Sequence, residues 1–273
     1  MKWFDTLFPP RKLVLANGKT VMQRRSRAPF MVLAVIAATV LSIDFTGFDI
    51  QMLLRRGYQF FYIIGQMIPP NWSYVPNIWG PLLDTIKMSL FGSMLGAAVA
   101  IPAAVLASSN VMKSRLIPVA MKSILSVMRT LPSLVTALVA TFIFGLGTLA
   151  GTAAIFIFTT AYVGKLLYEQ IENSDMQAFE AMEALGMNRL QAFRYAILPQ
   201  VMPVYLSTSM FCFEGNVRYA AILGYVGAGG IGLILDEGIG WRNYANVGAI
   251  LLMLIITVYL IESVSEHFRK KLI

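Results

Sequence analysis

Long stretches without a charged residue constrain the fold of this chain more than any other feature. They cover residues 28–43, 88–112, 130–164, 195–213, 219–235 and 243–261. A helix that crosses a bilayer needs about 20 consecutive, mostly apolar residues. Only 13% of the 273 residues are charged, whereas soluble domains carry about 25%. We therefore expect a membrane protein.

The apolar runs predict an all-α membrane fold with six membrane-spanning helices. The predicted spans are 28–44, 81–108, 116–145, 147–170, 197–222 and 242–264. The run 130–164 is too long for one helix, and Gly145-Leu146-Gly147 predicts a tight turn between two spans. Pro132 predicts a kink in the third span, because proline lacks the backbone N–H that a helix interior uses. The first span has no small-x-small cleavage site after it, so we interpret it as a retained anchor.

The distribution of Lys and Arg sets the expected orientation. Fifteen of these residues lie in 1–27, in 109–115, in 165–194 and in the C-terminal tail, against three in the segments on the opposite side. Loops rich in Lys and Arg stay in the cytoplasm, so both termini and segment 165–194 are expected there. This topology accounts for the net charge of +8, and no nucleic-acid partner is needed to explain it.

The topology divides the chain into three regions. Residues 1–27 form a basic cytoplasmic arm, which we expect to be partly helical along the membrane surface. Residues 28–80 contain the first span and a periplasmic loop. Within that loop, the aromatic-rich stretch 50–66 fits either an interfacial helix or a helix that only packs against protein. Residues 81–273 form the transmembrane core, which includes a charged cytoplasmic loop at 171–199.

The sequence argues against enzymatic, metal and cofactor chemistry in this chain. The lone Cys212 excludes an intrachain disulfide and a cysteine-based metal site, and the lone His267 lies in the basic tail. Residues 227–232 match G-x-G-x-x-G, but six membrane helices leave no room for the βαβ unit that a dinucleotide site requires. Residues 18–20 resemble the end of a P-loop, yet Leu13 stands where its first glycine is required. Any ATPase that drives this chain is therefore a separate subunit.

Segment 171–199 predicts two short helices at a bend between membrane spans. Ser174 and Gln177 fit a capping box at the start of the first helix. Gly186 stands where a left-handed C-terminal cap is favoured. Asn188 can cap a second short helix, and Pro199 suits the first turn of the fifth span. A helix–Gly–helix element of this kind suggests that a soluble partner grips it.

Ionisable residues within the predicted spans are candidates for a transport path. Glu214 and Arg218 are four residues apart on one helix face, which fits a structural ion pair as well as contact with a solute. Counting from Pro199 places Glu214 roughly 22 Å along the fifth span, in its outer half. Asn216 shares this region. Arg129 and Lys87 are further cations at membrane depth, which could equally serve helix packing or the interface.

A glycine-rich segment at 224–241 lies between the fifth and sixth spans. Non-helical backbone at membrane depth is tolerated only where it is buried in protein or lines a cavity. The segment is therefore either a partly re-entrant element beside the transport route or a flexible external turn. Its gate candidates are Gly227, Gly229, Gly230 and Gly232.

The charged loop resembles the EAA–Gly–Leu-Pro loop of permease subunits of bacterial ABC importers. The residues that carry this likeness are Glu180, Ala181, Glu183, Ala184, Gly186, Leu198 and Pro199. Met182 replaces the second alanine, and Ala196 stands where isoleucine is usual. The resemblance implies a coupling helix that docks in a groove on the ATPase.

Further stretches look like the phosphonate/phosphite permease family. They are Lys165-Leu166-Leu167, the run 198–203, the segment 213–220 with Glu214, Asn216 and Arg218, and the run 226–232. The likeness covers roughly residues 80–273. It implies a type I importer fold in the bacterial inner membrane, with two permease copies as a homodimer and two ATPase copies that bind ATP and Mg. It also implies a periplasmic binding protein that captures a phosphonate-like oxyanion.

Two other functions are weighed against this resemblance. An importer permease for a different small solute, such as an amino acid, would share the loop but not the Glu214–Arg218 segment. An ion-coupled secondary transporter would need several membrane-depth carboxylates, often within inverted repeats. Glu214 is the one convincing carboxylate of that kind.

Overall fold

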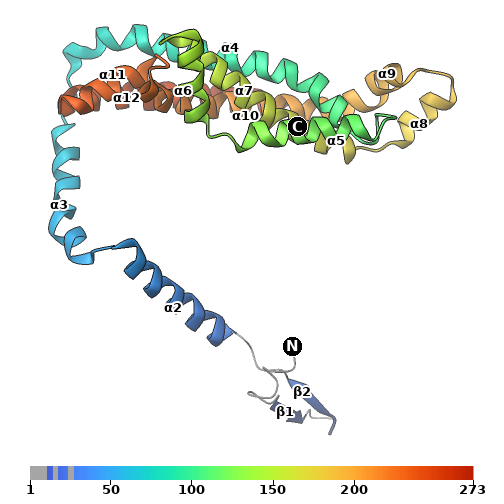
Figure 1. Ribbon diagram of the computed structural model, residues 1–273, viewed down its shortest axis with the longest axis horizontal. Helices are drawn as coiled ribbons and strands as arrows, with labels where there is room; N and C mark the ends of the chain where they lie inside the picture. Colours follow the sequence, from blue (N-terminus) through green and yellow to red (C-terminus); the bar gives the residue numbers. More distant parts are fainter. Residues whose placement is uncertain (1–10, 15–17, 24–27, 273) are drawn as a thin grey trace. The chain divides into compact units, whose positions relative to one another are not determined.

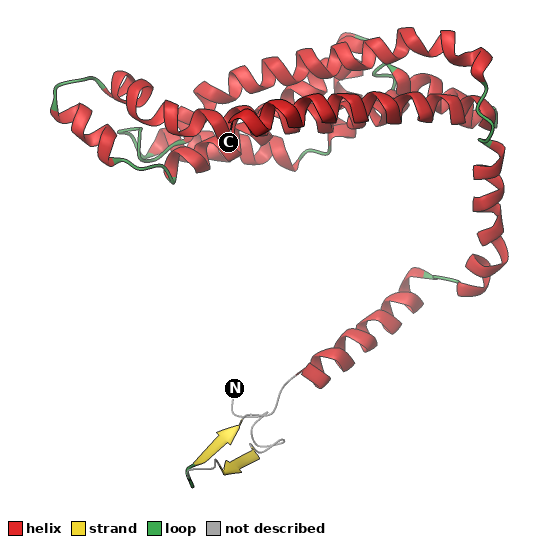
Figure 2. Cartoon of the chain, turned by 180° about the vertical axis from the view of Figure 1, so that it is seen from behind, coloured by secondary structure: helices red, strands yellow, loops and turns green. Residues whose placement is uncertain are grey.

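The computed structural model describes residues 11–14, 18–23 and 28–272, and these are helical apart from one small sheet near the N-terminus (Figures 1 and 2). Strands β1 (Arg11–Val14) and β2 (Thr20–Gln23) pair antiparallel, with Arg11 opposite Gln23. Gly18 has a φ of +74°, which suits the turn between them. The expectation of a partly helical arm is therefore wrong for these residues, and the rest of the arm lies outside the described chain.

The chain divides into two compact units, Met1–Tyr62 and Ile63–Ile273, which are described separately. The first contains the hairpin, helix α2 (Ala28–Thr46) and most of helix α3 (Ile50–Gln66). The axes of α2 and α3 are 74° apart. Asp49 caps α3, because its Oδ1 accepts hydrogen bonds from the backbone N–H groups of Gln51 (2.8 Å) and Met52 (3.1 Å).

The second unit is a bundle of long helices with short elements between them. Its long helices are α4 (Val75–Ala107), α5 (Leu116–Thr130), α6 (Ser133–Phe144), α7 (Thr148–Glu172), α10 (Leu198–Leu223) and α12 (Tyr244–Leu272). The short elements are η1 (Trp72–Tyr74), α8 (Gln177–Ala184), α9 (Arg189–Ala192), η2 (Phe193–Ile197), η3 (Gly224–Val226) and α11 (Ile231–Gly240). Four helical segments of the described chain are long and apolar enough to cross a membrane, or up to six if the bent pairs α2–α3 and α5–α6 each count as one span. The predicted number of six is the upper end of this range.

The third predicted span is broken rather than kinked. Helices α5 and α6 meet at 91°, and Leu131 and Pro132 between them have extended backbone. Proline disfavours helical backbone at the residue before it, so Leu131 leaves the helix. The predicted turn at 145–147 is confirmed, because Gly145 (φ +82°) ends α6 and Gly147 (φ +134°) precedes α7.

Small residues allow α4 and α7 to pack closely along their length. A Cβ atom built on Gly92 would lie 2.7 Å from the side chain of Ile155, and one on Gly96 would lie 2.6 Å from that of Thr159. Small side chains are what permits close helix approach where the surrounding lipid supplies no hydrophobic driving force. This face of α4 is therefore buried against α7.

Candidate functional site

The charged loop starts with a cap that differs from the predicted one. Asp175 caps α8, because its Oδ1 accepts a hydrogen bond from the backbone N–H of Gln177 (2.9 Å). The hydroxyl of Ser174 donates instead to the carbonyl of Ile171 in the preceding helix (2.7 Å). The predicted Ser174–Gln177 capping box is wrong, because α8 begins at Gln177, which is therefore its first residue and not the third residue that the box requires.

The bend at Gly186 has the predicted geometry. Gly186 adopts a φ of +88° and donates to the carbonyl of Glu183 (3.0 Å), while the next residue, Met187, donates to that of Met182 (3.1 Å). These two bonds form a Schellman motif, which closes α8. Asn188 then forms a full capping box with Gln191 at the start of α9. The loop is thus a defined two-helix bend.

The bend is anchored to the bundle by buried side chains and by one arginine. Phe179, Phe193 and Ile197 are buried against α4, α7 and the first turns of α10. Arg189 donates from Nη1 to the carbonyl of Val111 in the α4–α5 connection (2.7 Å), and its Nε lies 2.9 Å from Glu183 Oε1. The hydrogen bond between Arg189 and Val111 could not be predicted from local sequence patterns, since these residues lie 78 positions apart.

The outward surface of the bend is apolar and acidic. Glu180, Ala181, Ala184 and Gly186 are exposed, while Glu183 is half-buried beside Arg189. Leu185 and Leu190 are 80% and 74% exposed. Leu198 and Pro199 form the first turn of α10, where Leu198 is half-buried and Pro199 is exposed. An exposed apolar patch rimmed by polar groups is typical of a protein-binding surface.

Glu214 is the centre of a three-residue ion cluster. Its side chain is 4% exposed, and its two carboxylate oxygens face different arginines. Oε1 lies 3.3 Å from Nη2 of Arg218, as the spacing predicted, and Oε2 lies 3.5 Å from Nη2 of Arg269 in α12. The Arg269 guanidinium also lies 5.6 Å from the ring centre of Phe211. Sequence reasoning missed Arg269, because it counted the residue among the basic tail.

The contact with Arg269 changes the expected depth of Glu214. Arg269 is in the last turn of α12, beyond the uncharged run that ends at Ile261. Glu214 therefore lies level with the basic end of α12 rather than in the outer half of the span. The depth of Glu214 was counted from Pro199 as if the membrane began there. However, Val201 and Tyr205 in the first turns of α10 pack with the loop helices.

The other predicted path residues occupy separate environments. The Asn216 side chain is buried, and its Nδ2 donates to Ser93 Oγ (2.8 Å) and to Thr159 Oγ1 (2.9 Å), which links α10 to α4 and α7. Lys87 is exposed and lies 3.7 Å from Asp84. Arg129 is exposed at the end of α5. The structure thus brings Glu214 and Arg218 together and leaves Lys87 and Arg129 outside their cluster.

The glycine-rich segment is packed, and a flexible external turn does not describe it. Gly227, Gly229 and Gly230 have φ values between +72° and +78°. The carbonyl of Gly227 accepts a hydrogen bond from Gly147 (2.9 Å), and the N–H of Ile231 donates to Thr85 Oγ1 (2.7 Å). A Cβ atom on Gly232 would lie 2.0 Å from the carbonyl oxygen of Ala221. Glycine is therefore required where α11 meets the end of α10.

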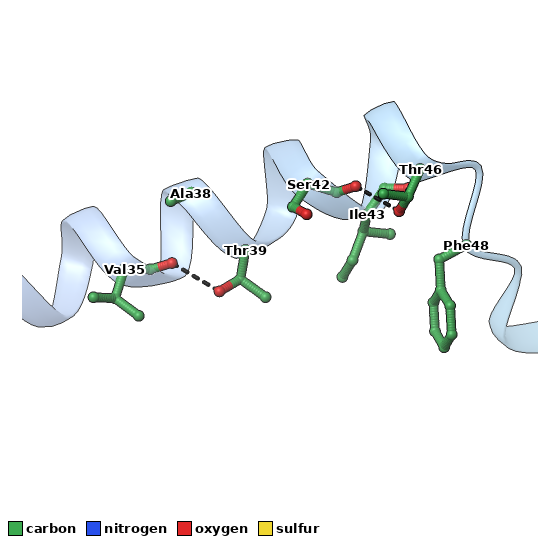
Figure 3. Close-up of a pocket in the computed structure, with 7 residues that line it drawn as sticks. All are labelled: Val35, Ala38, Thr39, Ser42, Ile43, Thr46 and Phe48. Atoms are coloured by element: carbon green, nitrogen blue, oxygen red, sulfur yellow. Dashed lines mark hydrogen bonds between the residues drawn. The ribbon is translucent and has the colours of Figure 1, made fainter. Parts of the chain in front are cut away.

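Two hollows on the described chain are lined mostly by apolar side chains. A groove of about 530 Å³ along α2 is formed by Val35, Ala38, Thr39, Ser42, Ile43, Thr46 and Phe48 (Figure 3). Another of about 390 Å³ lies beside the bend, between Val105, Ile117 and Leu190. Within the described residues, no three His, Cys, Asp or Glu side chains gather into a metal site.

Comparison with known proteins gives a consistent result. Residues 100–272 match the family described as binding-protein-dependent transport system inner membrane component. The chain is 33% identical over 212 residues to the phosphate-import permease protein PhnE of Mycolicibacterium smegmatis, which covers 77% of this chain but 40% of that relative. It is 31% identical to the phosphite transport system permease protein PtxC of Stutzerimonas stutzeri, with 76% of each chain covered. A solved inward-facing form of the MetNI methionine ABC transporter superposes on 74% of this chain and 99% of its own, with a TM-score of 0.65 and 20% identity.

Proposed function

The chain belongs to the family of binding-protein-dependent transport system inner membrane components, and on that premise we propose that it is the permease subunit of an ATP-driven importer for a phosphorus oxyanion. The relatives described above are named for phosphate and phosphite, and the Glu214–Arg218 segment resembles phosphonate permeases. Phosphonate, phosphite and phosphate share a tetrahedral anionic phosphorus centre, so they form the proposed substrate class. The chain is a transport subunit and not an enzyme.

One observation carries this proposal, namely the bend at 177–192 with its exposed Leu185 and Leu190. The bend joins α7 directly to α10 and is bonded to the α4–α5 connection through Arg189. A partner that moves the bend therefore moves α7, α10 and the α4–α5 connection. We assign that role to an ABC ATPase subunit, which binds ATP and Mg and is present in two copies. The bend is then the coupling helix.

We propose the remaining parts of the assembly from the resemblance to phosphonate permeases and from the distribution of Lys and Arg. A second copy of this chain completes the permease as a homodimer, and a periplasmic binding protein delivers the substrate. The chain lies in the bacterial inner membrane with both termini and the bend in the cytoplasm. Gly227, Gly229, Gly230 and Gly232 remain candidates for the gate.

The cluster around Glu214 supplies a positive charge suited to an anion. One carboxylate is shared by two guanidinium groups, so the three side chains together carry one excess positive charge. The Arg218 side chain is 53% exposed, whereas that of Glu214 is 4% exposed. Arg218 is therefore the group that can meet a passing oxyanion, and Glu214 weakens its hold so that the anion can leave.

The test is reconstitution with the ATPase and the binding protein. We expect co-purification of an ATPase subunit and faster ATP hydrolysis with phosphate, phosphite or methylphosphonate than with methionine. Replacing Leu185 by Asp should prevent co-purification, whereas Leu185→Met should preserve it because the surface stays apolar. Stimulation by methionine alone would overturn the substrate class. Uptake without any ATPase would overturn the importer assignment.

A further inference from the structure

We propose that α3 (Ile50–Gln66) is an amphipathic helix that lies along the outer surface of the membrane. Its apolar face would enter the acyl chains, and Arg55 and Arg56 would contact the phosphates of anionic lipids. This proposal concerns the first unit of the chain and holds whichever solute the permease carries. It decides between the two alternatives that the sequence left open for residues 50–66.

Most apolar side chains of α3 share one face, and Met52 and Ile63 lie outside it. Those on the face are Ile50, Leu53, Leu54, Phe60, Phe61 and Ile64, which follow each other at intervals that return to the same side of a helix. The opposite side has Gln51, Arg55, Gln59 and Gln66, with Arg56 beside it. No residue of α3 is buried, and Leu54 and Phe61 are 78% and 73% exposed. Within the first unit, no other element therefore covers this face.

Helix α2, before α3, has nearly the length of a full membrane crossing, although it counts among the possible spans above only together with α3. Helix α2 has 19 residues, about 28 Å at 1.5 Å per residue, which is close to the hydrocarbon thickness of about 30 Å. The hydroxyls of Thr39 and Thr46 donate to the carbonyls of Val35 (2.8 Å) and Ser42 (2.6 Å) within the helix, as Figure 3 shows. These hydroxyls therefore need no partner from lipid.

The angle between the two helices then sets the direction of α3. Thr46 ends α2, Gly47 follows with a φ of +62°, and Asp49 caps α3. A helix at 74° to a spanning helix runs close to the plane of the membrane. Helix α3 is ill-suited to span the membrane itself, because Arg55 and Arg56 occupy its middle.

The charged and aromatic groups of α3 point to a lipid surface as the occupant of its apolar face. Arginine pairs with phosphate through parallel hydrogen bonds, and two adjacent arginines complement anionic headgroups. Tyr58 and Tyr62 lie on one side of the helix, between the apolar and the polar face, and are 67% and 64% exposed. Tyrosine rings are enriched at the level of the headgroups. A face built for protein packing would not require two arginines and two exposed tyrosines beside it.

Spin-label accessibility in the full-length chain tests the proposal. Cys212 is the single cysteine, so a C212A background allows one new label at a time. The chain is placed in nanodiscs of phosphatidylethanolamine and phosphatidylglycerol. Labels at Phe60 and Ile64 should favour collision with oxygen and lie about 5–10 Å below the headgroups. Labels at Gln59 and Gln66, the matched polar positions, should favour a water-soluble nickel chelate.

Two results would overturn the proposal. Nickel access at all four positions would mean that α3 stands in water. Shielding of Phe60 and Ile64 from both reagents would mean that a protein surface, such as a second copy, covers the apolar face. A charge-reversed R55E/R56E variant gives an independent check, because its labels should become shallower in discs with phosphatidylglycerol but not in neutral discs. An unchanged depth in that variant would remove the role assigned to the arginines.

Discussion

Replacing Gly186 should change the conformation of the bend and leave the other exposed side chains of its surface in place. Gly186 has a φ of +88°, a backbone conformation that residues with a Cβ atom rarely adopt. No atom lies within 4 Å of a Cβ atom built at this position. A side chain there meets no steric obstacle, so the cost of a substitution is the cost of the backbone conformation alone.

That cost can be ranked for three replacements. A left-handed conformation costs an ordinary residue roughly 1–2 kcal/mol, which corresponds to an approximately 5- to 30-fold loss in the population of the bent form. Valine should be worse than alanine because its β-branched side chain crowds the backbone further. Asparagine tolerates left-handed backbone and should be nearly neutral. The expected order of function is Gly, then Asn, Ala and Val.

The assay is substrate-stimulated ATP hydrolysis and uptake by the reconstituted complex, with thermal stability of the permease measured in parallel. Because α8 is short and the anchoring residues Phe179 and Phe193 are untouched, the bundle should remain folded in every variant. Gly186→Val should lower uptake per ATP hydrolysed while the melting temperature changes little. Full coupling in Gly186→Val, or equal losses in the Asn and Val variants, would refute the argument that the bend transmits motion.

Three further substitutions test the packing that holds the bundle together. Gly232→Ala forces a Cβ atom to within 2.0 Å of a backbone carbonyl and should destabilise the protein by about 1–3 kcal/mol, whereas Gly240→Ala, with no atom within 4 Å, should melt like the parent. Asn216→Ala removes two buried side-chain hydrogen bonds and should cost about 1–3 kcal/mol in a detergent-melting assay. Lys122→Ala leaves Glu172, which it contacts at 2.8 and 3.0 Å, without its cation, and should cost about 1–2 kcal/mol. The double replacement of Lys122 and Glu172 should cost less than the two single changes together, and additive losses would show that the pair does not interact.

Local signals in the sequence predicted the helices and their ends well. Uncharged runs located the spans because lipid excludes charge, and this holds without any knowledge of the neighbours. Gly186 and Asn188 marked the bend because each side-chain or backbone preference acts within a few residues. The error at Ser174 had the same origin. The local pattern placed the cap of the helix at Ser174, whereas α8 begins three residues later, at Gln177.

Contacts between residues far apart in the chain could not be predicted from such local signals. Arg269 and Arg189 form their contacts with Glu214 and Val111 across 55 and 78 residues, and an arginine near a helix end has many solvated alternatives. A kink at Pro132 was predicted, but the observed break of 91° depends on what the two halves pack against. Sequence pattern limits where a helix ends, whereas tertiary packing sets the angle at which the next one starts.

The positions of Asn216 and Glu214 along the helix already argue against placing both residues on one transport path. Asn216 was grouped with Glu214 because the two are close in sequence, yet residues two apart on an α-helix point roughly 200° away from each other. Its true neighbours on the helix face are Cys212 and Ala220, which are small and buried against α4 and α7. Glu214 faces α12 instead, through Arg269. Helix α10 is therefore held on two sides: Asn216 bonds it to α4 and α7, and Glu214 bonds it to α12. A movement of the bend that shifts α10 must therefore change both sets of contacts.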